Sequence, residues 1–172
     1  DIYLEGNNGA RLKDVHIRQR HVDGKVELSV KSVLEKLSDK VNDDWTVEVT
    51  VAEENGEIFG RQVMGLKDLS GDIWRNPDED ITVMEHLTVE NPKLWWPNGY
   101  GEQPLYEVTV TVKDQDGNVA AEEQKVIGLR TMTDSQEKDQ WGSEFAIMVN
   151  GMKIYNVLFL GRAFLIILRM RV

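Results

Sequence analysis

The sequence predicts an all-β protein whose strands pair antiparallel in a two-layered sandwich. Apolar and polar residues alternate with a period of two in several separate runs, the pattern of strands with one buried and one solvated face. Turn dipeptides stand between these runs. Hydrophobic residues make up 41% of the 172 residues and charged residues 29%, which is the balance of a globular domain with its own core.

The alternating runs give the expected strands in chain order. Each run is rich in β-branched residues, which suit a pleated, half-buried surface, and such alternation favours an antiparallel sheet with one face on the core. Residues 32–41 also have some helical character, but they lie between two strand patterns, so a helix is the less favoured alternative there. The runs centre on residues 15–17, 26–30, 47–51, 81–83 and 108–112.

Three dipeptides that favour tight turns separate the runs: Asp23-Gly24, Asn55-Gly56 and Asp116-Gly117. These residue types tolerate the positive φ values of a two-residue type I′ turn, whose twist suits antiparallel neighbours. Such hairpins among about six or seven short strands favour a β-sandwich of immunoglobulin type. The polar stretch 76–80 is expected to be a loop that leads into the strand from Ile81.

The composition excludes several classes of function. The sequence has no cysteine, which excludes disulfides, thiolate metal sites and cysteine nucleophiles and leaves the compartment open. Acidic residues number 30 and basic residues 20, for a net charge of −10, the wrong sign for a surface that binds nucleic acid or an anionic membrane. The first residues have neither a basic start nor an apolar run, so we expect no signal peptide.

The ionisable residues give no signal for a cofactor, a metal or a catalytic group. Paired acidic residues recur at strand edges and in turns, but strand neighbours point to opposite faces, so we interpret these pairs as solvated charge. The stretch 114–118 resembles a calcium loop only briefly, because its glycine comes fourth instead of sixth and Lys125 stands where a bidentate glutamate is needed. His16, His21 and His86 lack the close spacing of a metal site.

One segment, residues 91–106, is unusual in composition. It contains two of the five tryptophans and three of the four prolines, which predicts a rigid, irregular excursion before the strand from Leu105. Two interpretations are open. The rigid aromatics and adjacent amides could form a platform on which a sugar stacks; the candidate binding residues are Trp95, Trp96, Asn98 and Tyr100. The tryptophans could instead form a packed corner, which residue type favours because large aromatics are mostly buried.

The same segment carries a family resemblance. Leu94-Trp95-Trp96-Pro97-Asn98-Gly99-Tyr100-Gly101, followed by Gln103-Pro104-Leu105-Tyr106, resembles the signature in the immunoglobulin-like domain of family 2 glycoside hydrolases, β-mannosidases above all. Residues 127–131 resemble the strand that closes this domain, and residues 145–155 resemble the hairpin that opens the catalytic barrel. The opening residues 2–5 with residues 12–17 are similar to the exit from the preceding sugar-binding domain.

The resemblance covers about residues 1–155 and implies a division of the chain. Residues 1–131 would form the sandwich, residues 132–155 a linker and the barrel-opening hairpin, and residues 156–172 a divergent tail. The implied parent is a retaining exo-glycosidase with an N-terminal jelly roll and a (β/α)₈ barrel, whose two catalytic glutamates lie at the ends of barrel strands.

The family's acid/base follows an asparagine, and this chain has no Asn-Glu dipeptide, so no catalytic residue is expected here. The expected role is a non-catalytic scaffold or spacer whose partners are the parent's other domains. The alternative is an independent carbohydrate-binding module that uses Trp95, Trp96 and Tyr100.

The C-terminal tail differs from the rest of the chain. Residues 1–155 have a net charge of −13, whereas the tail has Arg162, Arg169, Arg171 and no acidic residue. Its apolar run from Phe159 to Leu168 is shorter than the roughly 20 residues that span a bilayer. The family pattern also stops after Tyr155. A shifted reading frame or a foreign end explains this break, and so does a divergent tail.

The apolar tail should pack on its own sandwich or on another copy of the chain and make the protein self-associate, because its run from Phe159 to Leu168 has the composition that pairs with exposed sheet edges. Deleting residues 157–172 should therefore lower the apparent mass of the protein in solution, as measured by light scattering. If the protein is a monomer both before and after the deletion, this prediction is contradicted.

Overall fold

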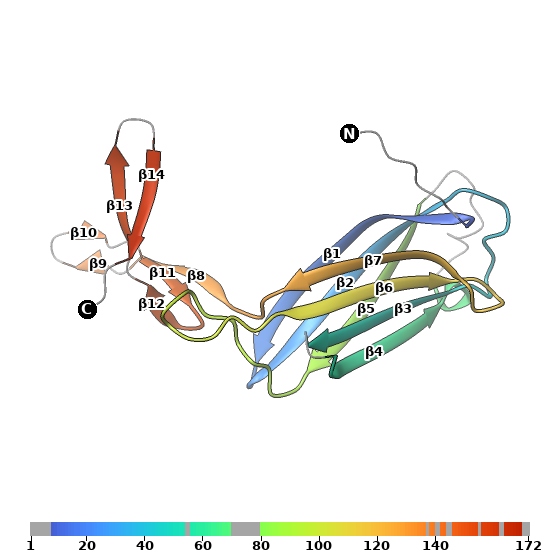
Figure 1. Cartoon of the computed structure of the whole chain (residues 1–172), viewed down its shortest axis with the longest axis horizontal. Coiled ribbons are helices and arrows are strands. Elements are labelled where there is room, and N and C mark those ends of the chain that lie inside the picture. The colour runs from blue at the N-terminus through green and yellow to red at the C-terminus, as the bar shows by residue number, and fades with distance from the viewer. Residues whose placement is uncertain are drawn as a thin grey trace. The chain divides into compact units, whose positions relative to one another are not determined.

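The computed structural model describes residues 8–53, 56–69, 80–136, 138–139, 142–143, 146–154, 156–161 and 164–169. Within these residues the chain consists of β-strands and a short 3₁₀ helix, η1 (Leu66–Asp68), without an α-helix (Figure 1). The chain divides into two compact units. The first comprises Asp1–Lys93 with Pro104–Leu129, and the second comprises Leu94–Gln103 with Arg130–Val172. The predicted all-β class is confirmed.

The first unit is a β-sandwich of two antiparallel sheets, as predicted. One sheet has the order β1-β2-β5 and the other the order β4-β3-β6-β7, and all neighbouring strands pair antiparallel. The sheets stack with β1 beside β7 and β4 beside β5 (Figure 1). The strands are β1 (Ala10–Val22), β2 (Lys25–Lys36), β3 (Thr46–Glu53), β4 (Ile58–Gly65), β5 (Ile81–Val89), β6 (Tyr106–Lys113) and β7 (Val119–Ile127).

The core of the sandwich is built from alternate residues of the central strands. On β2, β3, β5 and β6 the buried side chains occupy every second position, as a period of two requires. Most are valines, and complete burial of one such side chain contributes about 1.5–3 kcal/mol. Trp45 and Tyr106 are the largest fully buried side chains. The Tyr106 hydroxyl oxygen accepts a 2.9 Å hydrogen bond from the backbone N–H of Lys93.

The β1–β2 hairpin has the predicted two-residue turn. Asp23 and Gly24 have φ values of 49° and 77°, and the strands pair up to the turn on both sides, which is the geometry of a type I′ turn. Strands β3 and β4 also form the predicted hairpin, but the Glu53 N–H donates to the Glu57 carbonyl (2.9 Å), so the connection is longer than the predicted two-residue turn. Gly56 in its turn has a φ of 86°, and Asn55 lies outside the described residues.

The β6–β7 hairpin has a wider connection than the two-residue turn predicted at Asp116-Gly117. The Asp114 carboxylate accepts hydrogen bonds from the backbone N–H groups of Asp116 (2.9 Å) and Asn118 (2.8 Å). Of the predicted dipeptide, Gly117 has a positive φ of 81° and Asp116 does not. The side chain of Asp114 therefore organises the loop through local bonds to the backbone, which the turn dipeptide alone does not predict.

The structure decides two further local expectations. Residues 32–36 continue β2, because Ser32 and Leu34 keep the alternation and are buried while β2 pairs with β1 and β5 on its two sides. The helical alternative is thereby excluded. The prediction of a closing strand at residues 127–131 is wrong beyond Ile127, because β7 ends there. Leu129 is fully buried. The segment after Ile127 is therefore held by the packing of this side chain and not by the strand pairing that was expected.

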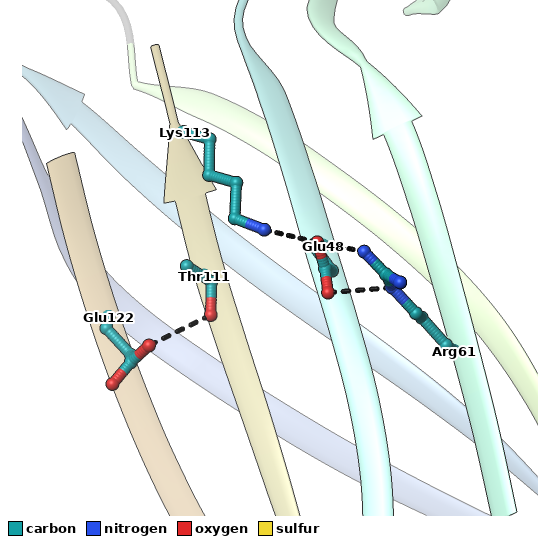
Figure 2. Close-up of polar contacts among 5 residues, drawn as sticks. All are labelled: Glu48, Arg61, Thr111, Lys113 and Glu122. Atoms are coloured by element: carbon teal, nitrogen blue, oxygen red, sulfur yellow. Dashed lines mark hydrogen bonds and ion pairs between the residues drawn. The ribbon is translucent and has the colours of Figure 1, made fainter. Parts of the chain in front are cut away.

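A ladder of charged side chains crosses the outer face of the β4-β3-β6-β7 sheet (Figure 2). Glu48 on β3 forms ion pairs with Arg61 on β4 (2.8 Å) and Lys113 on β6 (2.6 Å), and its side chain is only 13% exposed. The hydrogen bonds from Arg61 and then Lys113 lower the pKa of Glu48. On the neighbouring pair of strands, Thr111 donates a 3.1 Å hydrogen bond to Glu122. The ladder therefore links three adjacent strands while Glu48 is charged.

The second unit contains a three-stranded sheet and two strand pairs. Asn150 and Gly151, with φ values of 50° and 77°, join β11 to β12, which confirms a hairpin within residues 145–155; the two end residues of that range lie outside the described part. The sheet comprises β12 (Met152–Ile154), β11 (Ala146–Val149) and β8 (Met132–Ser135), and the pairs are β9 (Lys138–Asp139) with β10 (Gly142–Ser143) and β13 (Asn156–Gly161) with β14 (Phe164–Arg169).

Some sequence features fall outside the described residues. These are the opening residues 2–5 and residues 76–79 of the predicted polar loop. Strand β5 begins at Ile81, as predicted. In the part of the chain that the structure describes, no helix is long and apolar enough to cross a membrane.

One carboxyl group lies in the core of the first unit. Glu85 on β5 occupies a buried position between Val83 and Leu87 and is 1% exposed. Neither of its carboxyl oxygens has a hydrogen-bond partner among the described residues. Burial, and then the negative charge of Glu48, raise the pKa of Glu85 from 4.5 to about 8. The Glu85 side chain is therefore mainly protonated at neutral pH.

The raised pKa of Glu85 predicts that the sandwich loses stability as the pH rises. Because the folded pKa is about 8 and the ordinary value is 4.5, the stability is complete below pH 4.5, declines up to about pH 8 and is then constant. One pKa unit corresponds to about 1.4 kcal/mol, so the loss is at most about 5 kcal/mol. Urea unfolding between pH 5 and 9 measures it.

Glu85→Gln should remove this decline and make the protein more stable than the wild type at pH 9. The matched control is Glu27→Gln, which removes an exposed carboxylate from β2 and should keep the wild-type dependence on pH. If the free energy of unfolding of the wild type and of Glu85→Gln depends on pH in the same way, Glu85 does not titrate as the structure implies.

Candidate functional site

The segment with the candidate binding residues folds back on itself within the second unit. The Trp96 backbone N–H donates to the Glu102 carbonyl (2.9 Å), and the Tyr100 N–H donates to the Pro97 carbonyl (2.9 Å). Gly99, the third residue of the turn that the second bond closes, has a φ of 80°. A positive φ at this position is the mark of a type II turn, which requires glycine or asparagine. We call residues Leu94–Gln103 the tryptophan corner.

The side chain of Trp96 packs against the backbone of the tryptophan corner. A Cβ atom added to Gly101 would lie 2.7 Å from Cδ1 of the Trp96 indole, so only glycine allows the backbone to approach the ring this closely. The Gln103 amide nitrogen donates to the carbonyl oxygens of Trp96 (3.0 Å) and Gly101 (2.7 Å). Hydrogen bonds within the corner therefore involve both the backbone N–H and the backbone carbonyl of Trp96.

Trp95 contacts residues that follow the sandwich in the sequence. The Arg130 guanidinium carbon lies 4.4 Å from the centroid of the Trp95 ring, within the range of a cation–π interaction. The Asn150 amide nitrogen donates to the Trp95 carbonyl oxygen (3.0 Å), and the Asn150 side-chain oxygen accepts from the Thr131 N–H (2.9 Å). The Asn150 N–H in turn donates to the Thr131 carbonyl (3.1 Å).

These contacts make Asn150 the junction of three segments of the second unit. We call Trp95, Arg130, Thr131 and Asn150 the corner clamp. The clamp needs the left-handed backbone of Asn150, with a φ of 50°, which asparagine adopts more readily than most other residues. The β11–β12 turn therefore both reverses the chain and holds the tryptophan corner.

The structure places the four candidate binding residues in one corner, but with different exposure. Trp95, Trp96 and Tyr100 are each half-buried, and Asn98 is exposed. Because Arg130 lies over one face of Trp95, a sugar could stack only on the opposite face of that ring. Sugar binding at these residues therefore stays a prediction, and so does their role as a packed corner.

Sequence analysis missed the residues that hold the corner. Arg130 and Asn150 each belong to a segment matched to the family pattern, but their contact with Trp95 joins positions far apart in the sequence. The Asn-Gly dipeptide at 150–151 gave a signal for the turn and none for the bond to Trp95. Among the described residues, no group of three histidine, aspartate or glutamate side chains could hold a metal ion.

A comparison with models of protein families shows to which family the chain belongs. The family model described as Glycosyl hydrolases family 2 matches residues 10–130. The chain belongs to this family. The predicted resemblance is thereby confirmed, and the match covers the β-sandwich and the tryptophan corner.

Similar proteins in the family agree with the β-mannosidase resemblance. Beta-mannosidase B of Aspergillus terreus is 45% identical over 108 residues, which is 60% of this chain and 13% of that protein. Beta-mannosidase B of Emericella nidulans is 25% identical over 142 residues, 83% of this chain and 15% of that protein. The chain thus spans about one-seventh of the length of these relatives.

Solved structures of two similar enzymes have the same fold. A β-D-mannosidase from Dictyoglomus thermophilum superimposes with a TM-score of 0.70 at 24% identity, over 88% of this chain and 17% of that protein. A putative β-galactosidase from Bacteroides fragilis gives a TM-score of 0.68 at 21% identity, over 86% of this chain and 20% of that protein. At these identities the likeness shows the fold.

Removal of the Asn150 side chain should destabilise the second unit. Asn150→Gly keeps the left-handed backbone but loses the bonds to Trp95 and Thr131, so we expect a loss of about 1–3 kcal/mol. Thermal unfolding followed by tryptophan fluorescence measures the change. The control Asn118→Gly removes a side chain from the β6–β7 loop and should leave the fluorescence of the tryptophan corner unchanged. A loss below about 0.5 kcal/mol, typical of surface changes, would contradict the clamp.

Proposed function

We propose that this chain is a non-catalytic scaffold and spacer of a longer β-mannosidase-like hydrolase. The observation that carries the proposal is the corner clamp, in which the Asn150 side chain bonds both Trp95 and Thr131. A spacer has to hold its own segments in a fixed relation. The clamp does this for the tryptophan corner and the β11–β12 hairpin, which in the family's order of domains comes just before the barrel.

The relatives support a parent with further domains. Similar β-mannosidases extend well beyond the 13–15% of their length that this chain matches. The proposed partners of the chain are therefore the remaining domains of its parent, namely a sugar-binding jelly roll before the sandwich and a catalytic barrel after it. In this proposal residues 1–131 are the sandwich, residues 132–155 are the linker with the barrel-opening hairpin, and residues 156–172 are the tail.

The chemistry of the family supports a non-catalytic role. Retaining hydrolysis needs two carboxyl groups about 5–5.5 Å apart, one of which has a raised pKa to protonate the leaving oxygen. Glu85 has a pKa raised to about 8, but it is 1% exposed in the core of the sandwich and out of reach of a sugar. We therefore assign no catalytic role to Glu85 and place the catalytic glutamates in the barrel.

An independent carbohydrate-binding module is the second candidate. The half-buried Tyr100 and the exposed Asn98 of the tryptophan corner favour it, because a rigid ring beside an amide suits the face and hydroxyls of a sugar. The two candidates differ in whether mannobiose changes the fluorescence of the tryptophan corner. A saturable change that Trp95→Phe reduces would support the module, and no change supports the scaffold.

The 172-residue chain should have no glycosidase activity by itself. We expect no turnover of nitrophenyl β-mannoside, β-galactoside or β-glucosaminide above the uncatalysed rate, because the proposal places both catalytic carboxylates outside this chain. The assay measures nitrophenol release. The Glu85→Gln variant of the chain is the control for a contaminating enzyme, whose turnover the substitution would not change. Turnover that the substitution of one carboxylate in this chain abolishes would overturn the scaffold proposal.

A further inference from the structure

The outer face of the β1-β2-β5 sheet has an open depression of about 560 Å³ in the first unit. The antiparallel register arranges its lining residues in two rows across the three strands. The first row is His16, Lys31 and Met84, and the second row is Arg18, Ser29 and His86. Neighbours within a row are about 5 Å apart at Cβ, and the rows are about 7 Å apart. The depression therefore has the size of a small ligand.

The depression concentrates positive charge in an acidic protein. The chain has a net charge of −10, yet Arg18, Lys31 and two imidazoles converge here and no carboxylate lines the site. Within the described residues, no ion pair joins Arg18 or Lys31 to a carboxylate. Arg20, the next outward residue on β1, lies 3.8 Å from Glu27. Arg18 and Lys31, which have no ion pair with a carboxylate among the described residues, therefore line the depression, whereas Arg20 beside it is paired with Glu27.

Hydrogen bonds position the donors of the depression. The Ser29 hydroxyl and His86 Nδ1 are 3.0 Å apart, so His86 is held in place through one ring nitrogen while Nε2 stays available. The Arg18 Nε donates to His16 Nε2 over 3.4 Å. His16 Nε2 is the acceptor in this bond, so the imidazole helps to orient the guanidinium.

We infer that this depression binds a small ligand through a doubly charged oxyanion group, such as the sulfate, phosphate or paired carboxylates of an acidic sugar. A guanidinium on β1 and an ammonium on the neighbouring strand β2 suit such a group, because charge-assisted hydrogen bonds to oxyanions are the strong ones. The hydrogen-bonded pair of Ser29 and His86 adds one donor, which is the hydroxyl or Nε2–H according to the tautomer, and Met84 gives an apolar wall. The site is separate from the tryptophan corner and from the proposed scaffold role.

Titration of the intact chain with sodium sulfate tests the site. Sulfate carries two negative charges at neutral pH, so it is a simple probe for a doubly charged oxyanion. We expect saturable NMR shifts of the Ser29 and His86 amides, with a Kd of about 1–10 mM at low salt. Malonate in place of sulfate distinguishes a carboxylate ligand from a tetrahedral one. Erythritol, which has no charge, should give no shifts.

Variants locate the binding energy. Arg18→Gln and Lys31→Gln should each weaken sulfate binding about tenfold, the effect of losing one charged hydrogen bond. Arg20→Gln is the matched control: it removes the same charge from the same strand, but Arg20 lies next to Glu27, so the affinity should change less than about twofold. All three positions are exposed, and circular dichroism checks that the variants fold.

Binding that Arg18→Gln and Lys31→Gln leave unchanged, or that Arg20→Gln weakens equally, would overturn the site. So would the absence of saturable shifts with both sulfate and malonate.

Discussion

The fold depends on one constraint, namely that two sheets bury a continuous apolar layer between them. Alternate residues of β2, β3, β5 and β6 supply this layer, and the outward positions are left to polar ladders such as the one around Glu48. Glu85 occupies an inward position of the same register, so the layer imposes protonation on it. The pKa of Glu85, near 8, is a direct consequence of the register.

The tryptophan corner is ordered mainly by polar contacts. Trp95 and Trp96 are half-buried, and the corner is held by contacts of Gln103, Asn150 and Arg130. A corner held by polar side chains keeps a defined shape without a large core of its own. This property suits a connection between domains, because such a connection has to transmit position with little buried area.

The sequence predicted the sandwich well because its signals are local. The valines of residues 47–51 and 108–112 alternate strictly, and Asp23-Gly24 forms the expected turn. The wider β6–β7 loop was missed because Asp114 bonds the backbone through its side chain. Glu85 was within reach of prediction, since it continues the register of Ile81 and Val83.

The candidate site could be predicted only in part. The motif marked Trp95 and Trp96 as special, but the bond from Asn150 to Trp95 joins residues 55 positions apart, and no local pattern encodes it. The cationic depression was missed for a similar reason. His16 and His86 lack the close spacing of a metal site in the sequence, and only the register of three strands brings them to one site.

Native-state hydrogen exchange at the corner clamp tests the central claim most directly. If the tryptophan corner and the β11–β12 hairpin act as one spacer, the N–H groups of Trp96, Thr131 and Asn150, all bonded in the structure, should exchange with the same opening free energy as the amides of β11. Rapid exchange of Trp96 and Thr131 while β11 stays protected would show that the corner opens independently, and would contradict the scaffold account.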